Sequence, residues 1–520
     1  MGAILRARCR LRGACVAVAI AVAAVGGCAA AAVAEAETVQ VSVTSTRQGR
    51  PVASDFLGLA LEYSPIPGLA GSSNPKTVDP VAAQLIRNLD PGGRPVLRIG
   101  GQSADRSWWP VAGMRRPPGI TYDLSPAWTR SARALAQSTN AKLILGVELE
   151  ANRPRIDAVE GGHLLTGIGR PYLSAFEIGN EPELYTGVPW YRTLDGRALP
   201  WYSHDGTRVY ARPPTYGPAQ FASDFGRAEG ALPAVPIAGP VSGNVRYLDA
   251  FRRFVSPRSR VRTITWHAYG LNNCVKNPSS PEYPSVPNLL RLSTSRDIVN
   301  GVGPYIGLAH RDGAAFRIDE MNSVTCNGRL GVSNTMASAL WMMDALFTMA
   351  AHGVDGVNIH TYPQAANGLF DFLRSHGRWE GMVHAPYYGA LMFEQAAPAG
   401  SRLLALHAGS QQQVRAWATL GPDHRERVLL INDSLTTSAQ ALVAGVGAGP
   451  ATVARLRAPS AYATGGLSLG GAGFGARTAT GALPPVRAQS VTPRSGSYTV
   501  TMPAASAALL TVAPAGASAG

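Results

Sequence analysis

Short β-rich runs alternate with longer helical segments from about residue 56 to residue 398. Eight runs predict strands: Phe56–Leu61, Pro95–Gly100, Lys142–Val147, Ala175–Ile178, Val235–Ala238, Thr263–His267, Phe316–Asp319 and Gly356–His360. The segments with helical periodicity are Val81–Leu89, Pro126–Gln137, Ala219–Gly230, Tyr247–Val255, Asn288–His310 and Thr335–His352. Eight strand–helix units in succession indicate a closed parallel (β/α)8 barrel. An open doubly wound sheet is the less favoured alternative, because no glycine-rich phosphate loop follows an early strand.

The pattern changes after about Pro398. From Arg402 to Ala513, short alternating runs are separated by turns rich in glycine, serine and alanine, without helical periodicity. These features predict an all-β sandwich over residues 399–520. Thr38–Ser45 alternates in the same way, so we expect residues 35–50 to add a strand to that domain and residues 51–398 to form the barrel. The predicted fold class is α/β, a TIM barrel with a C-terminal all-β sandwich.

Residues 1–34 have the pattern of a signal peptide. Four arginines between residues 6 and 12 precede an apolar run from Ala14 to Ala34, whose last three residues offer a small-residue cleavage site. Residues 25–28 form a degenerate lipoprotein box, so a lipid anchor at Cys28 is the alternative. No later stretch is long and apolar enough to span a bilayer. We expect a secreted, extracellular protein, or else a lipoprotein at the cell envelope.

The chain is basic, but its charge says little about its partner. The net charge is +14, and removal of the four leader arginines leaves 14 − 4 = +10 for residues 35–520. Such a charge could favour an acidic polysaccharide as substrate. Only three of the 47 basic residues are lysine, however, which indicates compositional bias. No compact basic cluster is interleaved with aromatic residues, so we do not expect nucleic acid to bind.

Two glutamates stand where a barrel enzyme carries its chemistry, at the carboxyl ends of strands. The fourth predicted strand leads into Asn180-Glu181-Pro182, and the seventh into Asp319-Glu320. Retaining glycoside hydrolysis needs two such carboxyl groups ~5–5.5 Å apart, one protonated as the acid and one ionised as the nucleophile. Asn180 is suited to bind the sugar 2-hydroxyl. Glu177, inside the strand, is interpreted as a structural partner of a barrel arginine such as Arg98.

Five strings in order along the chain resemble glycoside hydrolase family 79, the β-glucuronidase and heparanase family of clan A. They are VLRIGGQSADRSWW (96–109), FEIGNEPELY (176–185), FRIDEMNSV (316–324), GVSNTMASALWMMDALF (331–347) and APYYGALMF (385–393). The resemblance covers essentially residues 38–515. It implies that Glu181 is the acid/base, that Glu320 is the nucleophile, and that Glu62 and Asp105 bind hydroxyls in the −1 subsite.

One departure from that family concerns the sugar. Family glucuronidases hold the uronate carboxylate partly through a tyrosine in the loop after the nucleophile, but residues 323–326 here read SVTC. Tyr362, after the eighth strand, or Tyr269, after the sixth, could supply the hydroxyl instead. His267 and His360 end the sixth and eighth strands and could bind substrate or Glu320, although buried structural histidines are nearly as well supported.

Two cysteines remain outside the leader, Cys274 and Cys326. In an exported chain, a single pair is typical of one disulfide. Cys274 lies seven residues beyond His267 and Cys326 six beyond Glu320, so both occupy similar heights above neighbouring strands. We therefore predict that they are bonded and fix one wall of the −1 subsite. No metal-ligand spacing surrounds them, and neither a metal nor another cofactor is expected.

Three functions are compatible with these features. The first is a retaining O-glycosyl hydrolase acting on β-glycosides, foremost β-glucuronides or uronate-containing polysaccharide. The second is a clan A glycosidase of another specificity, such as a xylosidase or arabinofuranosidase. The third is a non-catalytic polysaccharide-binding envelope protein, against which the two glutamates argue. Exo or endo action, the aglycone and the oligomeric state are not fixed by the sequence.

Overall fold

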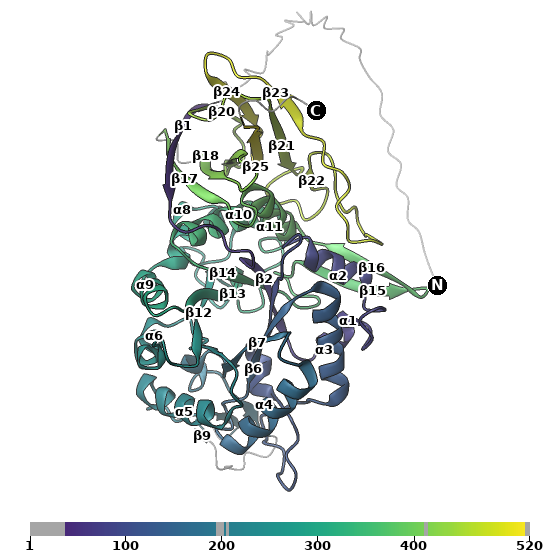
Figure 1. The fold of residues 1–520 in the computed structure, drawn as a ribbon, viewed down its shortest axis with the longest axis vertical. Coiled ribbons are helices and arrows are strands. Elements are labelled where there is room, and N and C mark those ends of the chain that lie inside the picture. The colour runs from purple at the N-terminus through teal and green to yellow at the C-terminus, as the bar shows by residue number, and fades with distance from the viewer. Residues whose placement is uncertain (1–36, 194–201, 204–206, 410–413, 515–520) are drawn as a thin grey trace, which may run out of the picture. The chain divides into compact units, whose positions relative to one another are not determined.

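A computed structural model describes residues 37–193, 202–203, 207–409 and 414–514. The predicted signal peptide and Cys28 lie outside the described residues. Eight parallel strands close into a barrel in chain order (Figure 1). The barrel strands are β2 (Leu57–Glu62), β3 (Val96–Gly100), β6 (Lys142–Val147), β7 (Leu173–Ile178), β11 (Ile237–Gly239), β12 (Val261–Asn272), β13 (Ala315–Thr325) and β14 (Gly356–His360). The eight predicted strands and the closed barrel are thus confirmed.

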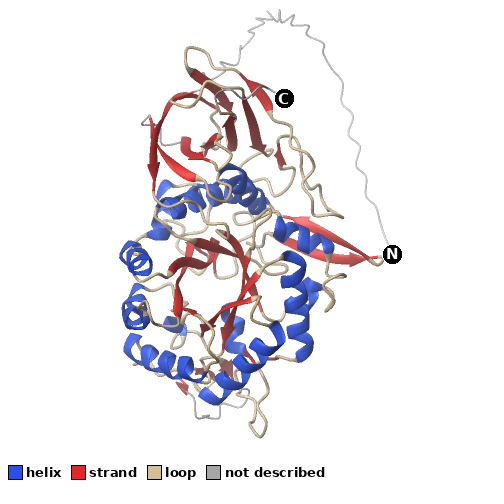
Figure 2. Ribbon diagram, viewed as in Figure 1, coloured by secondary structure: helices blue, strands red, loops and turns tan. Residues whose placement is uncertain are grey.

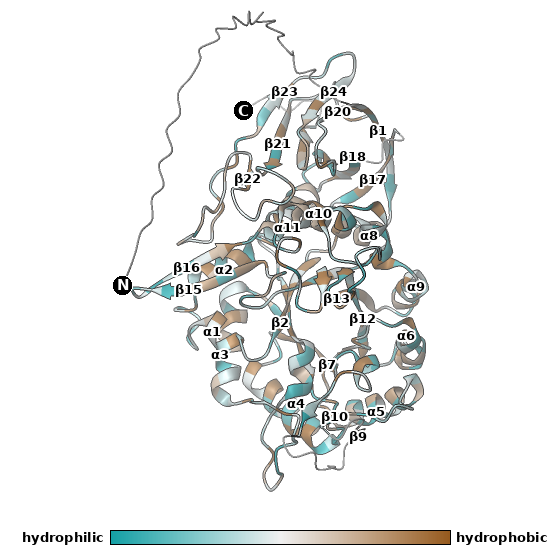
Figure 3. Ribbon diagram, turned by 180° about the vertical axis from the view of Figure 1, so that it is seen from behind, coloured by the Kyte–Doolittle hydropathy of each residue, from teal (hydrophilic) through white to brown (hydrophobic). Residues whose placement is uncertain are grey.

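Helices surround the barrel strands (Figure 2). They are α1 (Ile66–Ala70), α2 (Pro80–Arg87), α3 (Pro126–Thr139), α4 (Pro154–Ile168), α5 (Pro218–Ala231), α6 (Val245–Phe251), α7 (Val286–Leu289), α8 (Leu292–Arg296), α9 (Gly303–Arg311), α10 (Met336–Ala351) and α11 (Ala385–Ala396). Many show brown and teal stretches side by side in Figure 3, as helices with one buried face should. None of the helices in the described ranges has the length and apolar composition that a bilayer crossing requires.

Four helical segments differ from the prediction, and the first is the short α1, which was not predicted. The expected helix Asn288–His310 is broken into α7, α8, a 3-10 turn (Asp297–Val299) and α9. Helix α4 was not predicted, because three glycines interrupt its sequence and weaken the helical signal. Helix α11 was missed because it is buried on almost every side and therefore lacks an alternating polar face.

Strand β13 carries a bulge just before Glu320, one of the two candidate catalytic glutamates. Between Thr265 and His267 the neighbouring strand β12 advances two residues, while β13 advances three, from Arg317 to Glu320. The pairing with β14 shows the same extra residue on β13. A bulge breaks the alternation of side chains. It explains how two consecutive residues, Asp319 and Glu320, both contact groups inside the barrel.

Several short sheets decorate the barrel, and none of them was predicted. The clearest is the hairpin of β15 (Phe370–Ser375) and β16 (Arg378–Val383), joined by His376 and Gly377. Both turn residues have positive φ, as a two-residue type I′ hairpin loop requires. The others are β4 (Ser107–Trp108) with β5 (Tyr122–Asp123), and β8 (Tyr191–Arg192) with β9 (Tyr202–Ser203) and β10 (Arg208–Tyr210).

The C-terminal region is an all-β sheet with its own core. Its strands are β17 (Arg402–Ala408), β18 (Val414–Leu420), β19 (Glu426–Asn432), β20 (Ala439–Ala444), β21 (Ala451–Arg457), β22 (Ser468–Leu469), β23 (Gln489–Val491), β24 (Ser497–Met502) and β25 (Ser506–Val512). They follow one hydrogen-bonded path, β22-β21-β25-β19-β18-β17-β1-β20-β24, with β23 on β21. Residues from both ends of this path share one core, so the sheet folds over on itself. Strand β1 (Glu37–Gln48) lies within it, antiparallel to β17 and parallel to β20.

Candidate active site

A cavity of about 740 Å³ opens at the carboxyl ends of the barrel strands. This is the face at which TIM-barrel enzymes place their catalytic groups. Most of the residues singled out from the sequence line it: Glu62, Asn180, Glu181, Tyr269, Glu320, His360 and Tyr362. The fold therefore brings together side chains that are up to 300 positions apart in the sequence, since 362 − 62 = 300.

Glu320 is held as an ionised carboxylate. Arg98, from β3, donates from Nη1 to Oε2 at 2.7 Å, and the Tyr269 hydroxyl donates to Oε1 at 2.7 Å. Burial by itself would raise the pKa of Glu320, but His360, His267 and Arg98 outweigh it and hold that pKa well below its usual range. Both oxygens are thus oriented, and the group is charged at any ordinary pH.

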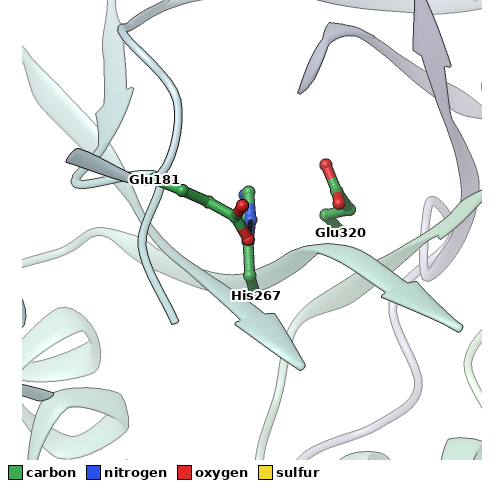
Figure 4. A group of neighbouring side chains, drawn as sticks. All are labelled: Glu181, His267 and Glu320. Carbon is green, nitrogen blue, oxygen red and sulfur yellow. Dashed lines mark hydrogen bonds and ion pairs between the residues drawn. The ribbon is translucent and has the colours of Figure 1, made fainter. Parts of the chain in front are cut away.

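Glu181 faces Glu320 from the loop that follows β7. Its side chain is 26% exposed, against 8% for Glu320, so it is open to the cavity. One oxygen of each carboxyl group and a His267 ring nitrogen all lie within 4.8 Å of one another. Figure 4 shows the Glu181 and His267 side chains meeting, with the Glu320 carboxylate across from them. Two carboxyl groups therefore oppose each other across the cavity.

The backbone at Glu181 adopts a rare conformation. Its φ is +47°, a left-handed value that costs a residue with a side chain roughly 1–3 kcal/mol. The Glu181 N–H donates to the Val241 carbonyl at 2.8 Å, and Val241 itself has φ +61°. The preceding Asn180 N–H is fixed by Asp105. These backbone hydrogen bonds hold the loop in one conformation, which places the Glu181 side chain over the cavity.

His267 contacts both the site and the barrel interior. Its Nδ1 lies 3.0 Å from Glu181 Oε1, and its Nε2 lies 3.7 Å from Asp319 Oδ2. Burial opposes a charge on this ring, but Glu320 and Asp319 outweigh burial and raise the His267 pKa well above its usual value. The ring is therefore placed to stabilise a carboxylate at Glu181.

A second chain of hydrogen bonds supports Glu320 from the other side. Tyr269, which donates to Glu320, lies 3.0 Å from His360 Nδ1, and His360 Nε2 lies 3.3 Å from Glu62 Oε1. Burial lowers the pKa of His360, but Glu320 and Glu62 raise it further, so the net direction is upward. Glu62 also accepts the Ser103 N–H at 2.9 Å. The Tyr269 hydroxyl is therefore committed to Glu320 and His360.

Two residues expected to contact substrate do not line the cavity. Asp105 is buried, and its oxygens accept from the N–H groups of Leu149, Glu150 and Asn180 and from the Tyr185 hydroxyl. It fixes the loops after β6 and β7, and its binding to a sugar hydroxyl stays a prediction. His267 likewise acts on Glu181 from below, since its side chain is only 1% exposed.

Cys274 and Cys326 form a disulfide with Cα atoms 6.0 Å apart, and both line the cavity. Cys326, Asn327 and Gly328 have consecutive positive φ values, so this loop turns sharply beside the site. Asn273 Nδ2 donates to the Gly328 carbonyl at 2.9 Å. The Tyr362 hydroxyl donates to Asn327 Oδ1 at 3.0 Å. One wall of the cavity is thus pinned by a covalent bond and two side chains.

Sequence reasoning missed the full role of Arg98. It was expected to pair with Glu177, and it does so at 2.7 Å through Nε. It also donates to Glu320 and, from Nη2, to Asn180 Oδ1 at 2.9 Å. The acceptance by Oδ1 orients the Asn180 amide so that its NH2 is the end able to donate to a substrate. The sequence signal that could have indicated this role is the position of Arg98, a charged residue inside the apolar strand VLRIG.

The barrel, the β region and the opposed carboxyl groups define the class: the chain has the fold of the clan A-type glycoside hydrolases. No protein-family model matches it. A curated β-glucuronidase of Aspergillus niger is 23% identical over 508 residues, or 85% of this chain and 86% of that protein.

Solved structures agree with this fold. A 4-O-α-L-rhamnosyl-β-D-glucuronidase from Fusarium oxysporum 12S superposes with a TM-score of 0.65 at 19% identity, over 91% of this chain and 100% of that one. A family 51 arabinofuranosidase from Xanthomonas axonopodis pv. citri gives 0.62 at 15% identity, over 92% and 100%. At these identities the likeness shows the fold, and the choice of sugar needs a separate argument.

Proposed function

We propose that this protein is a retaining glycoside hydrolase with Glu320 as nucleophile and Glu181 as general acid/base. The observation that carries the proposal is the gap between the two carboxyl groups, whose nearest oxygens lie within 4.8 Å. Retaining enzymes separate the groups by ~5–5.5 Å, whereas inverting enzymes need ~6.5–9.5 Å to admit a water. The environment of Glu320, which keeps this carboxylate ionised, supports its assignment as the nucleophile.

In the first step, Glu320 attacks the anomeric carbon while Glu181 protonates the departing oxygen. Arg98 and Tyr269 hold the nucleophile in one rotamer and keep it ionised, so little reorganisation is required on attack. The product is a covalent glycosyl–Glu320 ester and a free alcohol. The Tyr269 hydroxyl can then turn its hydrogen bond toward the sugar ring oxygen or the ester.

In the second step, water replaces the alcohol and Glu181, now a carboxylate, removes its proton. The water attacks the anomeric carbon from the side on which the alcohol left, so the configuration is retained. His267 stabilises the carboxylate form of Glu181 through the 3.0 Å contact at Nδ1. Asn180 is placed to donate to the sugar 2-hydroxyl, a bond that strengthens in the transition state.

For the sugar, we propose a β-glucuronide or another uronate, with an affiliation to family 79. The A. niger relative and the F. oxysporum structure carry glucuronidase names. Of the two tyrosines considered for the uronate carboxylate, Tyr269 is committed to Glu320. Tyr362, whose hydroxyl donates to the Asn327 side chain on the disulfide-pinned wall and not to a proposed catalytic group, is our choice. Export through removal of residues 1–34 belongs to the same proposal, and N-terminal sequencing of the mature protein tests it.

The likeness to an arabinofuranosidase keeps a second candidate in view. A panel of p-nitrophenyl glycosides distinguishes the two, because β-glucuronide turnover supports the first and pentoside turnover the second. Absence of turnover with every glycoside in the panel and with uronate polysaccharides would favour a binding protein. NMR of the first-formed anomer must show retention, and the Glu320→Gln variant must be inactive in the same assay to exclude a contaminating enzyme.

A further inference from the structure

Beneath the cavity lie two carboxyl groups that take no part in the proposed chemistry. Glu177, on β7, and Asp319, on the β13 bulge, are fully buried, and the charge of Asp319 acts on Glu177. Two buried anions repel each other, and neither can donate a hydrogen bond to the other, because neither carries a proton. A single proton held between them would remove both penalties.

The unpartnered oxygens indicate the same proton. Glu177 Oε1 and both Asp319 oxygens are buried. In the described part of the chain, none of these three atoms accepts a hydrogen bond from an N–H group or a hydroxyl. Such buried acceptors cost free energy when left without a donor. A proton on Glu177 Oε1 turns that atom into a donor toward Asp319. Its other oxygen, Oε2, keeps its 2.7 Å bond from Arg98.

The balance of buried charges at this level of the barrel also indicates one extra proton. Three buried carboxyl groups, those of Glu177, Asp319 and Glu320, face two cations, Arg98 and His267. Arg317, also on β13, is directed to Asp55 and Asn358. On the far side, His360 lies 3.8 Å from Glu320 Oε1 and 3.3 Å from Glu62 Oε1, so with Glu62 included four carboxyl groups face three cations. One buried anion would therefore lack a counterion, and burial of an uncompensated charge is costly.

Of the two groups, Glu177 is the one that keeps the proton. Burial and the adjacent Asp319 raise the pKa of Glu177 to about 8, with Arg98 opposing them. Burial also acts on Asp319, but His267 and Arg98 outweigh it and lower the pKa of that carboxyl. The two directions follow from position, because Asp319 faces His267 whereas Glu177 shares Arg98 with Glu320.

We propose that Glu177 holds a proton which it donates to Asp319, so that Asp319 stays the anion that keeps His267 charged beside Glu181. Glu177 is then a positioning residue that acts at two removes, through Asp319 and His267, on the acid/base. The functional consequence rests on the proposed function, but the shared proton does not. It is a property of the folded chain and can be measured without substrate.

The matched pair of variants is Glu177→Gln and Asp319→Asn. Glutamine copies a protonated glutamate, since its NH2 can donate to Asp319 while its carbonyl accepts from Arg98. Asparagine at 319 removes the anion facing His267. Infrared difference spectra of wild type minus E177Q at pH 6 should show the C=O band of a protonated carboxyl and no carboxylate bands. Nitrogen-15 NMR, with His267 assigned through a His267→Gln variant, should show an imidazolium in wild type and E177Q.

In D319N, the His267 imidazolium should lose its proton at a pH at least one unit lower. If the protein is a glycosidase, kcat/KM should fall less than about 5-fold in E177Q and more than about 100-fold in D319N, with a displaced pH profile only in the latter. A Glu177→Leu variant, which lacks both hydrogen bonds, should be as damaged as D319N. Carboxylate bands in the infrared difference, or loss of the imidazolium in E177Q, would overturn the proposal. Should D319N fail to fold, the infrared and NMR results on E177Q still decide.

Discussion

Asp157 allows a quantitative prediction about stability. It lies in the first turn of α4 and is 1% exposed, and burial together with the nearby Asp105 raises its pKa from 3.8 to about 8. The unfolded chain releases this proton near pH 4, whereas the folded chain keeps it to about pH 8. The stabilisation is therefore fully present below pH 4 and is lost as the pH rises through this window. Asp157→Asn, which is neutral throughout, should remove that loss.

The magnitude follows from the width of the window. About four pKa units at 1.36 kcal/mol each give an upper bound of roughly 5–6 kcal/mol. Water penetration into a buried site reduces such values, so we expect about half, roughly 3 kcal/mol at pH 8. Unfolding entropy of about 2.1 cal/mol/K per residue over a barrel of roughly 350 residues converts this to a Tm increase of roughly 4 °C.

Differential scanning fluorimetry of wild type and D157N at pH 4, 6 and 8 measures the effect. The two proteins should melt together at pH 4 and separate progressively toward pH 8, with D157N the more stable. Asp249→Asn is the matched control, because that side chain is 61% exposed and should leave the profile unchanged. If D157N loses as much Tm as wild type between pH 4 and pH 8, Asp157 is not a buried neutral acid and the reasoning fails.

Other expectations concern the site. Glu320→Gln should lower kcat by several orders of magnitude while circular dichroism and Tm stay near wild type; substantial residual turnover would exclude Glu320 as the nucleophile. Glu181→Ala should slow poor leaving groups by at least 100-fold more than p-nitrophenol, because an activated phenol needs little protonation; equal losses would contradict an acid role. Tyr269→Phe removes a donor to the nucleophile and should cost about 10–100-fold in kcat, measured at saturation. Cys326→Ser should raise KM more than it lowers kcat, since the pinned wall binds substrate; an unchanged KM would argue against that role.

The barrel could be predicted because each strand is a short apolar run between polar loops, and eight of them allow one closed arrangement. The glutamate pair was equally accessible, since strand ends converge on one face whatever the details of packing. Helices α4 and α11 were not, because a glycine-rich helix and a fully buried one both lack the alternation of polar and apolar faces on which such predictions depend.

The supporting residues of the site were harder to place. Asp319 and Glu320 are adjacent in sequence, and strand alternation would put them on opposite faces. Only the extra residue on β13, visible in its register with β12, turns both toward the barrel interior. Asp105 shows the opposite problem, since its type and position suit a sugar ligand, but four internal hydrogen-bond donors already occupy it.

Strand β1 is synthesised before the other described strands, but its hydrogen-bonded partners are among the last to be synthesised. Val43 pairs with Leu406 and Val41 with Val443, so the separations are 406 − 43 = 363 and 443 − 41 = 402 residues. The whole barrel must be synthesised before either partner exists, which makes this sheet a slow, high-contact-order part of the fold. A C-terminal fragment without β1 would expose the edges of β17 and β20 and be prone to pair with other chains. Trimming the chain past residue 48 should accordingly disrupt the distant sheet before it affects the adjacent barrel, and a synthetic β1 peptide added in trans should restore it.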